Sequence, residues 1–328
     1  MSNHPYSNLT PERVMDAVES LGFFCDARIF ALNSYENRVY QVGIEDQPPV
    51  IVKFYRPGRW SRACILEEHE FLLELQQQEL PVVAPLEYQQ QTLFSYDEFL
   101  FAVFPRKGGQ APEISDEDEL ELLGRWLGRL HTIGESKTFQ ARPRIQGAAD
   151  LEQAAEQVLQ SGLMPPDYQA VYRSLVPDLV TELQQHYPAT TRNIRLHGDL
   201  HPGNLLLRDE TLFLVDFDDC LLGPAMQDIW MLLSGGRQEQ QQQLMAIAEG
   251  YEMFRRFPAD ELPLVESLRT LRIARYAAWL SQRWQDPAFP AAFPWFTGHQ
   301  FWSQHILSLR EQLAALREPA LELPTFNF

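Results

Sequence analysis

The chain has 328 residues, 45% of them hydrophobic, which is enough to bury a sizeable core in two domains or in one large two-lobed domain. Asp and Glu total 45 against 27 Lys and Arg, and the resulting net charge of −18 argues against duplex nucleic acid and anionic membranes as partners. Three widely spaced cysteines indicate neither a disulfide framework nor a zinc site. The polar N-terminus lacks a signal-peptide core, and no apolar run approaches the roughly 20 residues of a membrane span, so we expect a cytoplasmic protein.

The first third of the chain has the pattern of a small antiparallel sheet with one main helix. Thr10 and Pro11 suit the cap and the first position of a helix that we expect to end near Leu21. A second helix is expected at 61–79, where apolar residues recur on one face. A turn at 45–48 joins two β-rich runs into a predicted hairpin. The expected strands are 28–32, 38–43, 50–55, 82–88, 92–95 and 99–104.

The segment 105–109, Pro-Arg-Lys-Gly-Gly, follows a predicted buried strand and has the composition of a hinge. We therefore expect an α+β fold with two lobes, a β-rich lobe at 1–106 and a mainly helical lobe at 107–328. The helices expected beyond the first helix of the second lobe cover 151–160, 167–186, 225–234, 238–255, 263–285 and 300–316.

The stretch 197–204, His-Gly-Asp-Leu-His-Pro-Gly-Asn, has the Asp-to-Asn spacing of a kinase catalytic loop, and Asp216 follows at the end of an apolar run. Phosphoryl transfer needs a carboxylate that accepts the proton of the attacking hydroxyl, and we assign that role to Asp199. Mg²⁺ prefers oxygen ligands and shares the nucleotide phosphates, so Asn204 and Asp216 are assigned as its ligands. Two Asp- and Gly-rich turns would be the structural alternative, but this does not account for the strand that ends in Asp216. Asp218 follows closely and could reach a second metal ion or the substrate.

Lys53 interrupts the apolar strand 50–54, which is unusual unless its amine meets an anion. In the kinase arrangement the lysine of this strand pairs with the nucleotide phosphates and with a helix glutamate. Glu67 and Glu68 are both candidates for that glutamate, and they point about 100° apart on a helix. The turn at 33–38 should cover the nucleotide, yet it contains no glycine; Ser34 could offer its hydroxyl and the flanking backbone amides to a phosphate.

Four further segments carry a family resemblance, at 32–40, 52–57, 65–69 and 286–290. With the catalytic string they make the chain resemble the protein-kinase-like phosphotransferases of the aminoglycoside phosphotransferase and choline kinase type, and more closely the bacterial stress response kinase A family. The resemblance implies a nucleotide-covering N-lobe and a C-lobe with the catalytic loop and substrate cleft. It also implies a cytoplasmic, monomeric enzyme that transfers phosphate from ATP, with Mg²⁺, to serine or threonine of a protein. It places Ser34 at the ATP site, and counting back from the turn at 80–82 favours Glu68 as the partner of Lys53.

Two other functions remain open from the sequence. Only eleven residues separate Asp216 from Asp228, too few for a long activation loop, so a small-molecule kinase acting on choline, homoserine or an aminoglycoside stays possible. Aromatic residues near the C-terminus could line its substrate site by cation–π attraction, although packing of the lobe is the favoured explanation. A silent nucleotide-binding pseudokinase is disfavoured because all four expected site residues are present: Lys53, Asp199, Asn204 and Asp216.

Overall fold

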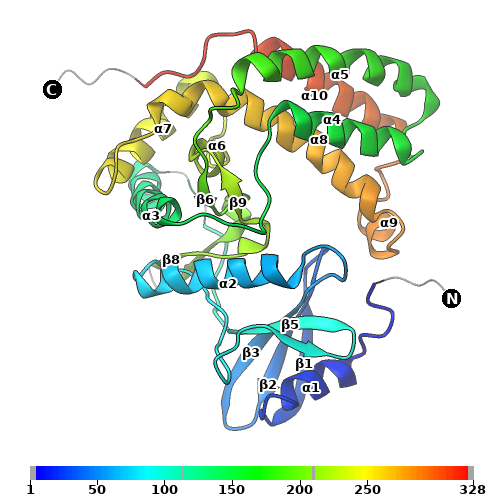
Figure 1. The fold of residues 1–328 in the computed structure, drawn as a ribbon, viewed down its shortest axis with the longest axis vertical. Coiled ribbons are helices and arrows are strands. Elements are labelled where there is room, and N and C mark those ends of the chain that lie inside the picture. The colour runs from blue at the N-terminus through cyan, green and yellow to red at the C-terminus, as the bar shows by residue number, and fades with distance from the viewer. Residues whose placement is uncertain (1–4, 113, 115, 209–210, 324–328) are drawn as a thin grey trace. The chain divides into compact units, whose positions relative to one another are not determined.

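A computed structural model describes residues 5–112, 114, 116–208 and 211–323 (Figure 1). The chain divides into two compact units, each made of several segments. Unit 1 comprises Met1–Ser115, Thr132–Pro143 and His197–Cys220, and unit 2 comprises Asp116–His131, Arg144–Leu196 and Leu221–Phe328. The mixed composition of a five-stranded antiparallel sheet and many helices confirms the predicted α+β fold class. The lobe boundary between residues 106 and 107 stays a prediction.

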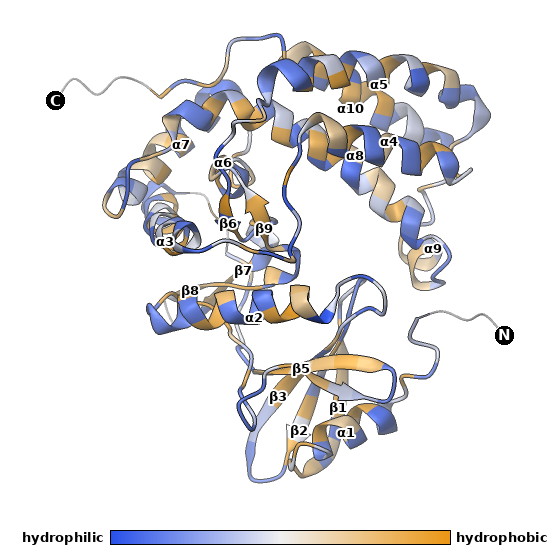
Figure 2. Ribbon diagram, viewed as in Figure 1, coloured by the Kyte–Doolittle hydropathy of each residue, from blue (hydrophilic) through white to orange (hydrophobic). Residues whose placement is uncertain are grey.

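The sheet of unit 1 has the strand order β1-β2-β3-β5-β4, and all its neighbouring strands are antiparallel. Its elements are α1 (Pro11–Glu19), β1 (Cys25–Leu32), β2 (Arg38–Ile44), β3 (Gln47–Phe54), α2 (Arg62–Gln77), β4 (Phe94–Tyr96) and β5 (Phe99–Pro105). Thr10 caps α1 and Ser61 caps α2, each by accepting a backbone N–H three residues later. Figure 2 shows that hydrophobic residues run through β5, whereas hydrophobic and hydrophilic residues alternate along α2.

The period of two in β3 decides where Lys53 lies. Val52 and Phe54 are buried in a core that also contains Val14 of α1. Lys53 falls on the opposite face of the strand, and its neighbour across β5 is Ala102, which packs with Ile65 of α2. The lysine is therefore directed toward the helix that carries the candidate glutamates.

The segment 82–88, which was predicted as a strand, forms none in the part of the chain that the structure describes. Pro81 and Pro85 flank and interrupt this segment, and proline cannot donate a ladder hydrogen bond. The segment instead makes single contacts: Leu86 donates its backbone N–H to the carbonyl of Val103, and Val82 forms an isolated parallel bridge with Leu214.

The catalytic stretch contributes short elements to unit 1. They are the 3₁₀ turn η1 (Pro202–Asn204), β7 (Leu205–Arg208), β8 (Thr211–Leu214) and the 3₁₀ turn η2 (Phe217–Asp219). β7 and β8 pair antiparallel, so Asn204 and Asp216 lie beside the same end of this hairpin.

Unit 2 is mainly helical, with one two-stranded sheet. The helix α3 (Glu117–Ser136) is shared between the units at His131, and the elements that follow are α4 (Ala148–Gln160), α5 (Pro166–His186), β6 (Ile194–Leu196), β9 (Leu221–Gly223), α6 (Met226–Trp230), α7 (Arg237–Glu252), η3 (Ala259–Leu264), α8 (Val265–Arg283), α9 (Ala288–Ala292) and α10 (His299–Ala315). α8 packs against α4 and α10, and α5 packs against the same two helices. Gly250 of α7 lets the backbone of α3 approach closely, since a Cβ there would lie 1.9 Å from the carbonyl oxygen of Glu121. No helix in the described parts of the chain combines the length and apolar character needed to cross a membrane.

Candidate phosphotransfer site

The loop that carries Asp199 is organised by the buried ring of His197. The Nε2 atom of His197 lies 2.9 Å from the carbonyl oxygen of Val215, so this nitrogen must carry the proton and donate it. The other ring nitrogen, Nδ1, is then free of a proton and accepts the backbone N–H of Asp199 at 3.3 Å. The ring also packs on Phe217, with the centroids 4.4 Å apart. His197 therefore joins the loop of Asp199 to the strand end that precedes Asp216, which is a structural role and not that of a metal ligand.

Asn204 makes a second connection between the same two segments. Its side-chain nitrogen Nδ2 donates to the carbonyl oxygen of Asp199 at 2.9 Å, and its own carbonyl oxygen accepts the N–H of Val215 at 3.0 Å. Because Nδ2 is committed to this bond, Oδ1 is the side-chain atom of Asn204 that can serve a cation.

Asp216 has a left-handed backbone, with φ 62° and ψ 63°, and its side chain is 59% exposed. Such a conformation is uncommon for a residue with a side chain, and strain of this kind clusters at functional sites. The exposed carboxylate of Asp216 and the amide oxygen of Asn204, on residues that lie beside the same end of the β7–β8 hairpin, are donors that suit Mg²⁺, which keeps several waters and shares substrate phosphates. Among the described residues, no group of three or more His, Cys, Asp and Glu side chains is arranged to hold a metal ion.

Lys53 lies in a buried cluster of charged side chains next to Asp216. Its Nζ atom is 2.9 Å from Asp218 Oδ1, 3.5 Å from Glu68 Oε1 and 3.7 Å from Asp216 Oδ1. Burial alone would lower the pKa of Lys53, but Asp218 and Glu68 more than offset this, and the pKa is raised well above its usual value. The lysine is therefore positively charged wherever the protein is folded near neutral pH.

Asp218 is a structural centre of the cluster. Its side chain is 6% exposed, and its two carboxylate oxygens pair with Lys53 and with the guanidinium of Arg59. Burial alone would raise the pKa of Asp218, yet Lys53 and Arg59 reverse the effect and hold the pKa below its usual range. Both oxygens thus have cationic partners supplied by the protein, whereas the carboxylate of Asp216 is much more exposed.

The two glutamates of α2 have different partners. Glu68 is buried, and its Oε1 lies 3.5 Å from Nζ of Lys53. Glu67 accepts hydrogen bonds from the backbone nitrogens of three consecutive residues in unit 1, Gln140, Ala141 and Arg142. Glu67 therefore anchors a loop, and Glu68 faces the candidate site.

Arg142 is a component of the site that the sequence did not reveal. Its guanidinium donates to Glu68 Oε2 at 2.6 Å, to the carbonyl oxygen of Asp218 at 2.6 Å and to that of Cys64 at 2.8 Å. It thereby ties α2 to the segment that follows Asp216. Arg59, which contacts Asp218, was missed as well. The one signal in the sequence was the acidic pair Asp218 and Asp219. Such a pair predicts nearby cationic side chains but does not identify them.

Ser34 lies half-buried in the turn between β1 and β2. In unit 1 this turn is held by Asn37, whose side-chain oxygen accepts the backbone N–H of Arg56 at 3.1 Å. This bond holds the end of the turn at Asn37, and the contact of Ser34 with a phosphate stays a prediction.

Asp228 of unit 2 is fully buried and belongs to a separate series of hydrogen-bonded side chains. His131 Nε2 lies 3.3 Å from Asp228 Oδ2, and His131 Nδ1 lies 3.0 Å from the hydroxyl of Tyr251. Burial lowers the pKa of His131, so the ring is neutral, donating to Asp228 and accepting from Tyr251.

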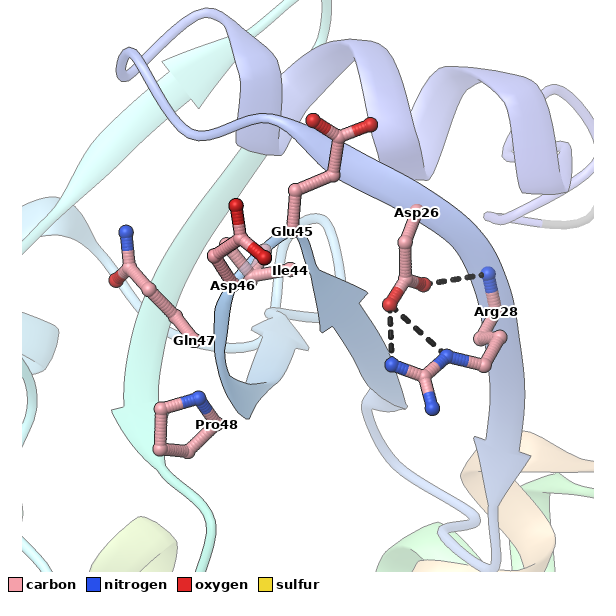
Figure 3. A pocket seen from close by; sticks show the side chains of 7 residues that line it. All are labelled: Asp26, Arg28, Ile44, Glu45, Asp46, Gln47 and Pro48. Atoms are coloured by element: carbon pink, nitrogen blue, oxygen red, sulfur yellow. Dashed lines mark hydrogen bonds and ion pairs between the residues drawn. The ribbon is translucent and has the colours of Figure 1, made fainter.

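A pocket in unit 1 lies at the β2–β3 hairpin, away in sequence from the loops described above. Figure 3 shows its lining residues, Asp26, Arg28, Ile44, Glu45, Asp46, Gln47 and Pro48. The backbone N–H and the guanidinium of Arg28 both donate to the carboxylate of Asp26. We assign this pocket no part in phosphoryl transfer, because none of its lining residues belongs to the loops of Asp199 or Asp216.

Comparisons with known proteins identify the family of this chain. Residues 28–262 match the model of the phosphotransferase enzyme family. Stress response kinase A of Escherichia coli (strain K12) is 43% identical over 318 residues, which cover 97% of each chain. The serine/threonine protein kinase RdoA of Salmonella typhimurium is 43% identical over the same share.

Solved structures share the fold at lower sequence identity. The amicoumacin kinase hAmiN, solved with AMP-PNP, Ca²⁺ and Ami, gives a TM-score of 0.73 at 19% identity and covers 95% of this chain and 94% of its own. A microcompartment-associated aminopropanol kinase gives 0.66 at 20% identity, with 92% of this chain and 96% of its own covered. The fold is therefore that of the kinase-like phosphotransferases, and the chain belongs to the phosphotransferase enzyme family, grouping within it with the stress response kinase A proteins.

Proposed function

We propose that this phosphotransferase is an ATP- and Mg²⁺-dependent serine/threonine protein kinase with Asp199 as its catalytic base. The observation that carries the proposal is the pair of bonds that Asn204 makes with Asp199 and Val215. They bring a candidate base, an amide oxygen and the carboxylate of Asp216 into one small loop assembly, the combination that phosphoryl transfer requires.

Asp199 would accept the hydrogen bond, and finally the proton, of the attacking hydroxyl. The carboxylate is partly exposed, with its Oδ2 3.6 Å from Nε2 of His201, so it is accessible to a substrate group. His201 Nδ1 accepts the N–H of Gly203 at 3.0 Å, which leaves Nε2 as the protonated nitrogen on the side of Asp199. His201 thus helps to orient the base.

Asn204 Oδ1 and Asp216 would hold Mg²⁺, which when bound neutralises charge on the nucleotide phosphates. Lys53 supplies a positive charge near Asp216. Glu68 of α2 pairs with Lys53 of β3 and with Arg142, and so holds the lysine in place. Ser34 would contribute its hydroxyl from the covering turn. Together these groups position ATP, and the reaction needs little more from the protein than such positioning.

The protein acceptor is supported by the relatives that cover nearly the whole chain, one of which is named a serine/threonine protein kinase. The structural neighbours are named for small molecules, amicoumacin and aminopropanol, but at 19% and 20% identity they speak for the fold alone. In unit 2, Phe289 and Phe296, two of the aromatic residues near the C-terminus, are fully buried, which favours packing over a ligand cage for these two. We propose that the active form is a monomer in the cytoplasm.

The acceptor class can be tested with labelled ATP and Mg²⁺. The purified protein is incubated with a generic protein acceptor, and in parallel with choline, homoserine and an aminoglycoside; Asp199→Ala is run beside each reaction. We expect label on serine and threonine of the protein acceptor and none with Asp199→Ala. Label on a small molecule alone would replace the protein-kinase proposal by the small-molecule one, and labelling that persists in Asp199→Ala would refute the assigned base.

A further inference from the structure

Two arginines of the segment after β3 hold the glycine-free turn between β1 and β2. Arg56 donates from Nε to the carbonyl oxygen of Glu36 at 3.0 Å and from its terminal nitrogen to that of Tyr35 at 3.2 Å. Its Nε also lies 2.9 Å from the carboxylate of Glu36. The turn that carries Ser34 is therefore held by the contacts of an arginine. Glycine-rich loops differ, because they depend on the conformational freedom of their backbone.

Arg59 lies within ion-pair distance of the same turn and pairs closely with the segment after Asp216. Its Nε lies 3.8 Å from Glu36 Oε2, and its two terminal nitrogens pair with Asp218 and, at 2.5 Å, with Asp219 Oδ1. The side chain of Arg59 is 11% exposed and its guanidinium lies 5.2 Å from the centroid of the Trp60 ring. A buried guanidinium in a fork with two carboxylates is a strong and directional contact.

The chain of contacts runs from Ser34's turn through Glu36 and Arg59 to Asp218 and Asp219, two and three residues after the candidate metal ligand Asp216. We propose that Arg59 is a positioning residue that couples the nucleotide-covering turn to the metal-binding segment, so that the turn and Asp216 are correctly placed together. This inference rests on the proposed function, because it assumes that Mg²⁺ and a nucleotide bind between these two segments of unit 1.

The coupling has a measurable signature. If Arg59 joins the two segments, its loss weakens binding of the Mg²⁺–nucleotide complex more than it slows the transfer step, because the base Asp199 is held by separate contacts to His197 and Asn204. Loss of Asp219 should have the same effect through the same contact. The two losses combined should then cost little more than either alone.

The experiment measures binding of a fluorescent ATP analogue at several Mg²⁺ concentrations, together with KM and kcat for ATP. The variants are Arg59→Gln, Arg59→Lys, Asp219→Asn and the double variant Arg59→Gln/Asp219→Asn. Arg62→Gln is the matched control, since this arginine lies three residues further along and donates to Ser95 and to the carbonyl of Leu93. Asp219 is 48% exposed, so Asp219→Asn keeps the test open even where Arg59→Gln folds poorly.

We expect Arg59→Gln and Asp219→Asn each to raise KM for ATP and the dissociation constant by about tenfold, with a smaller change in kcat. The midpoint of the Mg²⁺ titration should move to higher concentration, and the double variant should resemble the worse single one. Arg59→Lys should recover part of the affinity, and Arg62→Gln should match the wild type.

Wild-type affinity in Arg59→Gln, or strictly additive effects in the double variant, would overturn the coupling while leaving the proposed function in place. A wild-type protein that binds no nucleotide in the presence of Mg²⁺ would overturn the proposed function and this inference with it.

Discussion

The Nζ atom of Lys53 lies closer to Asp218 than to Glu68, at 2.9 Å against 3.5 Å. Asp218 is therefore the main counter-ion of the strand lysine, and Glu68 divides its two oxygens between Lys53 and Arg142. In this protein the lysine–glutamate pair of the kinase arrangement is part of a larger buried network of three cations and two carboxylates.

Removing the charge of Asp218 should destabilise the fold. Asp218→Asn leaves Lys53 and Arg59 buried with less opposing charge, and breaking a buried pair in this way costs about 3–5 kcal/mol. We expect the free energy of unfolding, measured by urea denaturation, to fall by an amount of this order. Asp219→Asn is the matched control because Asp219 is half exposed, and a pair at that exposure contributes at most about 1 kcal/mol. Equal stabilities for the two variants would contradict the central place of Asp218.

The adjacent glutamates of α2 should separate catalysis from stability. Glu68→Gln weakens the contact that positions Lys53, and a displacement of about 1 Å in a site of this kind costs about 10²-fold in rate. Glu67→Gln weakens the anchoring of the loop at 140–142 and should lower the free energy of unfolding by about 1 kcal/mol with little effect on the rate. Phosphate transfer and urea denaturation of both variants check this. A larger loss of rate in Glu67→Gln would reverse the assignment of the two residues.

Glu261 of unit 2 should make stability depend on pH. Its carboxylate accepts the backbone N–H of Met226 at 2.8 Å, and burial raises its pKa to about 7. A carboxyl whose pKa is higher in the folded state than in the unfolded state stabilises the fold below pH 4.5, and this contribution is lost as the pH rises toward 7.

The variant Glu261→Gln keeps an oxygen acceptor and removes the titration. Relative to the wild type, we expect it to become more stable as the pH is raised from 5 to 8, by on the order of 1–2 kcal/mol. Thermal and urea unfolding across this range measure the difference. A difference that stays constant with pH would show that Glu261 does not titrate as the structure indicates.

Most of the candidate site could be predicted because its members are close in sequence or fixed by strand period. Asp199, Asn204 and Asp216 fall within one short stretch. The alternation of side chains along β3 places Lys53 on the face of the strand that is directed toward α2. The partner of Lys53 could be narrowed to two adjacent glutamates of the predicted helix, Glu67 and Glu68. Because these side chains point about 100° apart, only one of them can face the lysine.

The missed residues act over long separations in sequence. Arg142 meets Glu68 across 74 positions, and Arg59 meets Asp218 across 159. Neither local propensity nor periodicity carries information about such pairs. The segment 82–88 was wrongly predicted as a strand because its apolar residues outweighed Pro81 and Pro85, and the short helix α9 escaped notice because Pro290 lies within it.

The role of Asp199 as the base is tested by comparing Asp199→Asn with the wild type in two assays, nucleotide binding and a single turnover of phosphate transfer. Asp178→Asn, an exposed change on α5, serves as the control. We expect Asp199→Asn to bind the Mg²⁺–ATP complex nearly as well as the wild type while its transfer rate falls by about 10²–10⁴-fold. Transfer within tenfold of the wild-type rate, with binding intact, would contradict the assignment of Asp199 as the base.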